Sequence, residues 1–546
     1  MSPAALNLWV FRDGRRLVSG QQLKSSFLDC LNRLPGRCSQ EDLLRALLRA
    51  GELESAVSDA GFCAGALQDV TDSLAQALVG FQPIHAFHQR EVLDRCEIPE
   101  ILSTSVPEGF AYYVLHPLAY ADVLDSLPPR AREVVVIGIR SIGSTLSAVT
   151  AAEARKRGRH ALRMTVRPHG HPYNRRTAFA PQQQEIIRGA LAGGADFLIV
   201  DEGPGLSGSS FLSAAEALLG EGVAAEAITL ICSHHPDFDS FRADDGPRRA
   251  RRFRWVSVES IPRRPKDAQV YVGGGEWRRS HFADEANWPA SWINLERSKY
   301  VSPSATRRRL YKFVGLGHYG DEVLERERRL AAHGFAPTPQ EDVHGFASYE
   351  WLDARPMRPG DLTQPMLFRL AEYCAFRAEA FASDLADLNP LQRMAQYNLA
   401  QMGIQFPVAL HLERPVIADG RMQPHEWLLA QDGGILKTDG GSHGDDHFFP
   451  GPTDIAWDLA GTILEWRMNK EQAQAFLETY RKLTGDNAQS RIADFTFAYA
   501  GFRCAYSQMA ANALHGTSEQ SRLQQAAEHY WEVLGGRAAT LTASAR

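Results

Sequence analysis

The sequence predicts an α/β protein whose central part is built on a parallel sheet. Two apolar runs, at residues 134–139 and 197–200, each end in a short loop rich in Gly and Ser, and a helix-forming segment follows each loop. A third apolar run lies at 227–232. Continuous apolar runs of this length are typical of strands buried on both faces, and strand–loop–helix units in series build a parallel sheet. We therefore expect a ligand site at the carboxyl ends of these strands.

Length and composition predict several folded domains. At 546 residues the chain exceeds one typical core, and its hydrophobic and charged contents, 44% and 23%, are those of globular proteins. Without a long apolar run or a secretory pattern, we expect a cytoplasmic protein that is not inserted in a membrane. The net charge of −6 does not favour nucleic-acid binding, and homo-oligomerisation stays open. Seven dispersed cysteines indicate reduced structural thiols.

The first candidate site follows the apolar run at 197–200. Two adjacent acids, Asp201 and Glu202, are followed by a Gly- and Ser-rich loop and then by a helix-like segment. Gly and Ser supply hydroxyls and close backbone N–H groups at the start of a helix, which suits a phosphate group. The two acids could hold sugar hydroxyls or a magnesium-bound sugar phosphate. Together these residues predict a pocket for a phosphorylated sugar.

A second loop and a basic segment strengthen this prediction. Arg140, Ser141 and Gly143 follow the run at 134–139, and the planar fork of Arg can meet two phosphate oxygens at once. Between the two loops, a strand enters a segment punctuated by Pro and Gly. This segment carries Arg167, His169, His171, Arg175 and Arg176.

These motifs resemble those of the type I phosphoribosyltransferases. The resemblance implies a phosphoribosyltransferase-like fold with Mg²⁺ and phosphoribosyl pyrophosphate as ligands. Asp201 and Glu202 would contact the ribose and its Mg²⁺, Arg140, Ser141 and Gly143 the pyrophosphate, and the segment with Arg167 would close over the site. The 5-phosphate would be held by Gly205, Leu206, Ser207, Gly208 and Ser209.

The resemblance also implies a reaction, displacement of pyrophosphate at the anomeric carbon of the sugar. Several purine-using members carry an acid where this chain has Gly205, so a general base must come from elsewhere. His169 and His171 are candidates by their titration range. The acceptor is predicted to be a small molecule of unidentified type. A sensor that binds phosphoribosyl pyrophosphate without turnover is the alternative from another functional class.

The C-terminal half carries a second resemblance, to the aminoglycoside and choline kinases. It rests on the segment 421–427, on the segment 435–441 that contains Asp439, and on Asp458 in the sequence Thr453-Asp-Ile-Ala-Trp-Asp-Leu-Ala-Gly. The resemblance implies ATP as a ligand, Glu426 and Asp439 as magnesium ligands, and Asp458 as a brace of the catalytic loop. Upstream, Lys312 in a short strand and Glu327 on the next helix would orient the nucleotide phosphates.

Two departures from that family pattern keep several interpretations open. Arg421 stands where the family has its catalytic Asp, and Arg cannot act as a general base at neutral pH. Glu426 stands where the family has Asn, although Glu can still ligate magnesium. Asp419, two residues before Arg421, is a substitute candidate. A divergent phosphotransferase, a nucleotide-binding pseudokinase and a coincidental likeness all fit these residues.

We therefore predict three regions. Residues 1–80 would form a helical N-terminal cap, because Ser39 and Asp42 precede leucines at helical spacing. Residues 81–300 would form the phosphoribosyltransferase-like domain, and residues 301–546 an α+β kinase-like domain. The predicted function is magnesium-dependent phosphoribosyl transfer fused to a kinase-like phosphotransferase. The alternative is a small-molecule kinase whose central domain only binds substrate.

Overall fold

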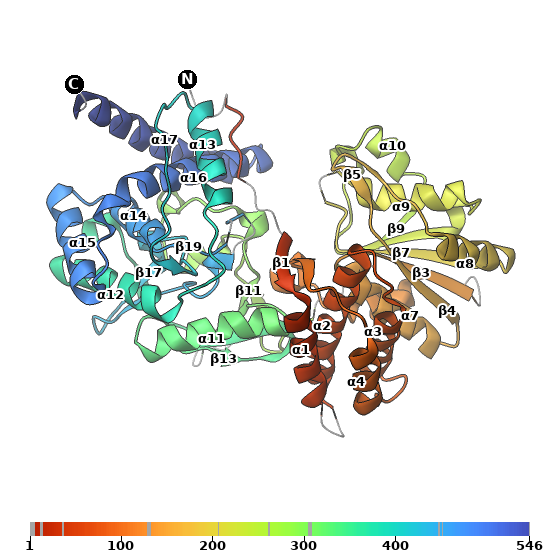
Figure 1. Ribbon diagram of the computed structural model, residues 1–546. Coiled ribbons are helices and arrows are strands. Elements are labelled where there is room, and N and C mark those ends of the chain that lie inside the picture. Colours follow the sequence, from red (N-terminus) through yellow and green to blue (C-terminus); the bar gives the residue numbers. More distant parts are fainter. Residues whose placement is uncertain are drawn as a thin grey trace.

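The structure is a computed structural model that describes residues 6–10, 15–34, 38–127, 133–205, 207–259, 263–303, 308–445, 448–449 and 451–544. Figure 1 shows the helical N-terminal region between a parallel-sheet domain and a larger C-terminal half. The predicted α/β class, with a parallel sheet and helical regions, is confirmed. Within the described residues, no helix has the length and apolar character needed to cross a bilayer.

The N-terminal region is helical, as predicted. Its helix α2 begins with a capping box between Ser39 and Asp42, and its leucines at 43, 44, 47 and 48 are buried. A short antiparallel ladder joins the start of this region to the segment ahead of the central sheet. The elements are β1 (Arg15–Ser19), α1 (Gly20–Asn32), α2 (Gln40–Asp59), α3 (Gly65–Leu78), α4 (Ala86–Arg95) and β2 (Ile101–Ser105).

A buried arginine anchors this cap to the central domain. Arg163 lies on a central strand, and its guanidinium is bidentate to Glu54 of α2, at 2.9 and 3.0 Å, and also pairs with Asp72 of α3. The Arg163 side chain is fully buried and that of Glu54 is 1% exposed. Because charges removed from water are stable only when paired, this contact fixes the position of the cap.

The central domain is a five-stranded parallel sheet covered by helices. Its strands lie in the order β4 (His160–Val166), β3 (Glu133–Ile139), β7 (Asp196–Val200), β8 (Ile228–Cys232) and β9 (Arg254–Ser257). The connecting helices include α7 (Gly143–Lys156), α8 (Pro181–Ala192) and α9 (Ser209–Gly220), with short α5 (Glu108–Ala111), α6 (Ala119–Asp122) and α10 (Gly246–Ala250). The predicted strands at 134–139, 197–200 and 227–232 correspond to β3, β7 and β8. The basic segment forms a hairpin, β5 (His169–His171) and β6 (Asn174–Arg176).

The C-terminal half begins with a five-stranded antiparallel sheet. Its order is β10 (Val270–Tyr271), β11 (Lys299–Val301), β12 (Arg309–Phe313), β14 (Phe346–Glu350) and β13 (Gln340–Glu341). Helix α11 (His318–Ala332) connects β12 to β13. Because β10 and most of β11 precede residue 301, this sheet draws on a segment that the sequence assigned to the central domain.

A mainly helical part completes this half. It contains two small sheets. One consists of β15 (Ala354–Pro356), β17 (Trp427–Ala430) and β18 (Ile435–Lys437), and the other of β16 (Pro415–Val416) and β19 (Thr453–Asp454). The helices are α12 (Gln364–Ala380), α13 (Asn389–Gln401), α14 (Ala456–Glu465), α15 (Lys470–Thr484), α16 (Ile492–Ala513) and α17 (Ser518–Ser544).

One continuous hydrophobic core joins the three regions. Leu47 of the cap, Val136 of the central sheet, and Phe313 and Phe346 of the antiparallel sheet all belong to it. Arg45 of α2 also reaches across to α11, where it pairs with Asp321, and to Glu341 of β13 at 2.9 Å. The cap therefore packs against both of its neighbours, in agreement with its central place in Figure 1.

Candidate nucleotide cleft and sugar-phosphate site

A buried lysine lies at the centre of the C-terminal cleft. Lys312 comes from β12 and is 3% exposed. Its Nζ lies 3.3 Å from Glu327 Oε1 on α11 and 2.6 Å from Asp439 Oδ1, just after β18. It also donates to Ser442 Oγ at 3.0 Å. The structure thus brings together three of the predicted nucleotide-binding residues from three separate elements.

A second lysine, which the sequence did not single out, also reaches Asp439. Lys299 of β11 places its Nζ 3.1 Å from Asp439 Oδ2 and 2.9 Å from Glu296 Oε1. Although burial acts to raise it, the ammonium groups of Lys299 and Lys312 hold the pKa of Asp439 well below its usual range. Both oxygens of this carboxylate therefore carry a cation partner.

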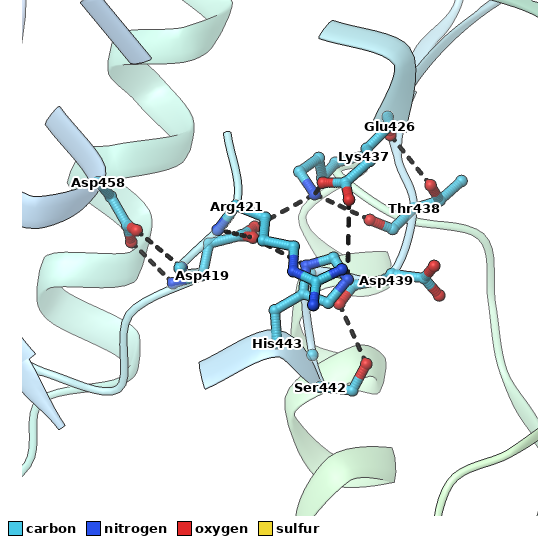
Figure 2. Close-up of polar contacts among 12 residues, drawn as sticks. Asp419, Arg421, Glu426, Lys437, Thr438, Asp439, Ser442, His443 and Asp458 are labelled. Atoms are coloured by element: carbon cyan, nitrogen blue, oxygen red, sulfur yellow. Dashed lines mark hydrogen bonds and ion pairs between the residues drawn. The ribbon is translucent and has the colours of Figure 1, made fainter. Parts of the chain in front are cut away.

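The segment after β16 forms the loop that the sequence assigned to catalysis. Asp458 on α14 accepts hydrogen bonds from the backbone N–H groups of Asp419, at 2.8 Å, and Gly420, at 2.9 Å (Figure 2). Asp458 thus holds the backbone of this loop, and Arg421 comes directly after the two residues that it contacts. Its guanidinium lies over the ring of Tyr506, 5.6 Å from the ring centre. Asp419, the substitute candidate, is buried, and its Oδ1 accepts a hydrogen bond from the backbone N–H of Arg421 at 3.3 Å.

A third lysine holds the acids of this loop. Lys437 on β18 is 1% exposed, and its Nζ lies 2.9 Å from Glu426 Oε2 and 3.4 Å from Asp419 Oδ2 (Figure 2). His443 Nδ1 lies 3.3 Å from Asp419 Oδ1. Against the effect of burial, Lys437 lowers the pKa of both Asp419 and Glu426. Glu426 and Asp419 are therefore held as buried anions, each with a cation beside it.

A cavity of about 230 Å³ lies over these groups. Its polar floor includes Lys299, Lys312 and Asp439, and its apolar walls include Leu310 and Leu428. The segment 272–298, between β10 and β11, covers one side, where His281 stacks on Trp351 with ring centres 5.3 Å apart. The central domain contributes Tyr112 and Tyr113 to the rim, a contact that the sequence did not predict.

In the central domain, the two predicted acids lie at the carboxyl end of β7. Burial raises the pKa of Asp201 to about 7 and, with the nearby charge of Glu108, the pKa of Glu202 to about 8. Asp201 Oδ1 accepts a hydrogen bond from the backbone N–H of Glu202 at 2.8 Å. Among the described residues, neither acid forms a direct ion pair. Both carboxyls therefore bind a proton up to a higher pH than exposed acids do.

The predicted pyrophosphate loop meets an acid from the cap. Arg140 Nε lies 2.7 Å and Arg167 Nε 3.1 Å from Asp59 Oδ1, at the end of α2. Ser141 accepts a hydrogen bond from Ser105 Oγ at 3.0 Å. Gly143 begins α7 against β3, where a Cβ would lie 2.9 Å from the carbonyl carbon of Gly138. Asp59 could not be recognised from the sequence, because it belongs to a distant helix.

A second cavity, of about 390 Å³, lies between this loop and the cap. Arg15, Asp59, Ser141, Arg167 and His169 are among the residues that line it. Asp201, Glu202 and the predicted phosphate loop do not line it among the described residues. The structure therefore gathers only part of the predicted sugar-phosphate site around one cavity.

The basic hairpin rests on the predicted phosphate loop. Ser209 Oγ donates to the backbone oxygen of Pro172 at 2.5 Å, and Ser207 Oγ lies 3.0 Å from Ser209 Oγ. Gly205 and Gly208 have positive φ, of 59° and 64°, which favours glycine at both positions. Leu206 lies outside the described residues. His171 is exposed and lines neither cavity, whereas His169 lines the second.

Comparison with known proteins gives structural matches only. No protein-family model matches the chain, and no curated protein does. A choline kinase, LicA from Streptococcus pneumoniae, matches with a TM-score of 0.29 and 13% identity over 42% of this chain and 89% of its own. A choline/ethanolamine kinase family protein from Mesorhizobium loti matches with a TM-score of 0.32 and 13% identity, over 44% and 84%. Macrolide 2'-phosphotransferase MphH from Brachybacterium faecium matches with a TM-score of 0.30 and 14% identity, over 46% and 95%. Because these values are low, we base the function on the contacts of this chain's own residues.

Proposed function

We propose that the C-terminal half binds ATP in its cleft and acts as a phosphotransferase on a small molecule. The observation that carries this proposal is the position of Lys312, whose ammonium contacts both Glu327 and Asp439 beneath a cavity. A lysine fixed by an acid on a neighbouring helix is suited to orient nucleotide phosphates. The apolar walls at Leu310 and Leu428 suit a flat base.

Catalysis at this site would rest on positioning and on charge rather than on a carboxylate base. Phosphoryl transfer passes through a loose transition state in which little covalent chemistry is asked of the protein. Lys312 and Arg421 both line the cavity and supply positive charge where the transferred group would develop negative charge. This interpretation accommodates Arg421 at the position where a base is otherwise expected.

A kinase-like site implies magnesium, and whether the ion fits depends on which carboxylate oxygens are free to bind it. The predicted ligands are Glu426 and Asp439, and each already holds an ammonium group at 2.6 to 3.1 Å. Carboxylates engaged in this way do not fit a resident divalent ion, since the ion and the ammonium would compete for the same oxygens. Glu426 and Asp439 therefore do not fit a resident magnesium ion in this cleft.

The test is ATP binding and transfer by the purified full-length chain. Calorimetry should show ATP binding to the wild type, and binding at least about tenfold weaker in a Lys312→Met variant. Lys482→Met is the matched control, because that lysine is 73% exposed on the far helix α15. Transferase activity is then measured as transfer of the γ-phosphoryl group of ATP to each of a panel of hydroxyl- and amine-bearing acceptors. Equal ATP binding by wild type and Lys312→Met would refute the proposal.

A second function is favoured by a different observation, the pairing of Arg140 and Arg167 beside Ser141 in the central domain. Two guanidinium groups that converge on one carboxylate form a place where a diphosphate would be equally well held. With Asp201 and Glu202 at the end of β7, this supports phosphoribosyl pyrophosphate as the ligand. The sugar transfer and the sensor role both remain proposals for this domain.

This second proposal is tested by binding and by turnover. Calorimetry with phosphoribosyl pyrophosphate and Mg²⁺ should give a signal that the Asp201→Asn, Glu202→Gln double variant loses. Release of pyrophosphate in the presence of candidate acceptors would identify a transferase, and binding without consumption would identify a sensor. No binding by the folded wild type would refute both roles.

A further inference from the structure

Three lysines of the C-terminal cleft lie against five carboxylates. Asp439 lies against Lys299 and Lys312, and Glu426 lies against Lys437. All three lysines line the cavity that we assign to the nucleotide. Asp439 and Glu426, the two predicted magnesium ligands, therefore already contact ammonium groups before any ligand binds.

Lys437 occupies the point where a metal ion would otherwise be held. Asp419, Glu426 and His443 offer ligand atoms within 4.8 Å of one another, an arrangement that could hold a cation. The Nζ of Lys437 lies 2.9 Å from Glu426 Oε2 and 3.4 Å from Asp419 Oδ2. A divalent ion bound to the same oxygens, at its usual 2.0–2.6 Å, would lie close to a buried ammonium group. Repulsion between them excludes the ion while the lysine stays.

The oxygens of Asp439 are engaged in the same way. Lys312 Nζ lies 2.6 Å from Oδ1 and Lys299 Nζ 3.1 Å from Oδ2. The acids of the central domain provide a contrast, since Asp201 and Glu202 have no direct ion pair among the described residues. The compensation by lysine is therefore a property of the C-terminal cleft rather than of every acid pair in the molecule.

We propose that the cleft binds its nucleotide without a divalent cation, and that the ammonium groups of Lys299, Lys312 and Lys437 take the place of the metal. The ligand class is a metal-free nucleoside diphosphate or triphosphate, whose phosphate oxygens accept hydrogen bonds from these ammonium groups. This inference rests on the proposed function, because it concerns the chemistry of the same cleft. It reverses the prediction that Glu426 and Asp439 bind magnesium.

The first experiment needs only the wild-type chain. ATP is titrated into it by calorimetry, once with excess EDTA and once with excess Mg²⁺. We expect an affinity in EDTA that equals or exceeds the affinity with Mg²⁺. Binding about tenfold or more weaker in EDTA would overturn the inference while leaving the proposed ATP site intact. No binding under either condition would overturn the proposed function and the inference with it.

A variant then tests the role of Lys437 directly. Lys437→Met removes the ammonium from Asp419, Glu426 and His443, and we expect it to bind Mn²⁺ in the absence of nucleotide, which the wild type does not. Mn²⁺ binding by the wild type at this site would contradict the inference. Because a buried lysine is removed, folding is checked by circular dichroism, and Lys299→Met serves as the second variant. Lys299→Met should weaken ATP binding in EDTA about tenfold, whereas Lys482→Met should not.

Discussion

The sharpest consequence of the structure concerns the buried acids of the central domain. Asp201 and Glu202 have pKa values raised to about 7 and about 8, mainly by burial. In the unfolded chain both carboxyls titrate near 4, so between these values the native state binds more protons than the unfolded state. The free energy of unfolding therefore falls as the pH rises from about 4 through about 8. Asp201→Asn combined with Glu202→Gln removes both titrations and should remove this fall.

The size of the effect follows from the two shifts. One pKa unit corresponds to about 1.4 kcal/mol, so each shift of roughly three units gives an upper limit of about 4 kcal/mol. The two carboxyls interact, and solvent reaches both of them in part, so we expect less than the sum. The wild type should lose about 3–5 kcal/mol of stability between about pH 5 and about pH 9 relative to the double variant.

The assay is urea denaturation of both proteins across that pH range, followed by tryptophan fluorescence. An exposed acid provides the control, because Asp239 is 77% exposed and Asp239→Asn should leave the slope of the wild-type profile unchanged. Parallel profiles for the wild type and the double variant would refute the reasoning. They would mean that folding does not raise the pKa of either carboxyl.

Two further outcomes are expected from contacts of the cap. Arg163→Met leaves the buried Glu54 without its partner and should cost about 3–5 kcal/mol in urea denaturation. Arg157→Met, which removes a partly exposed arginine from Asp125 and Glu153, should cost less than about 1 kcal/mol. Equal losses would contradict this account. Asp59→Asn releases the two arginines that it holds, and calorimetry should show about tenfold tighter binding of pyrophosphate. An unchanged affinity would show that Asp59 does not compete for that position.

Much of the fold could be read from local sequence patterns. The apolar runs that became β3, β7 and β8 were recognisable because a strand buried on both faces leaves a continuous hydrophobic signal. The capping box at Ser39 was recognisable because Ser and Asp three residues apart satisfy the first N–H groups of a helix. Asp458 was recognised only through the resemblance to the aminoglycoside and choline kinases, and in the structure it accepts hydrogen bonds from the backbone N–H groups of Asp419 and Gly420.

Domain limits were harder to place, because the segment 270–301 contributes two short strands to a sheet formed mostly by later residues. Strands of two and three residues carry too few side chains for a readable alternation. The sequence therefore assigned them to the preceding domain. Only the backbone pairing of β10 with β11, and of β11 with β12, shows where they belong.

The sequence by itself determined which acids and bases are available and on which elements they lie, since those depend on neighbours within a few residues. It placed Asp201 and Glu202 at a strand end and Lys312 on a strand. The kinase resemblance placed Asp439 on a later strand, and in the structure Asp439 follows β18. The tertiary structure alone decided which charges meet. Lys299 is 140 residues from Asp439, and Asp59 is 81 residues from Arg140. No local sequence pattern predicts such contacts, because they form when elements that are distant in the sequence pack together. The sequence therefore predicted Asp439 and Glu426 as magnesium ligands, whereas in the folded chain lysines lie against both of them.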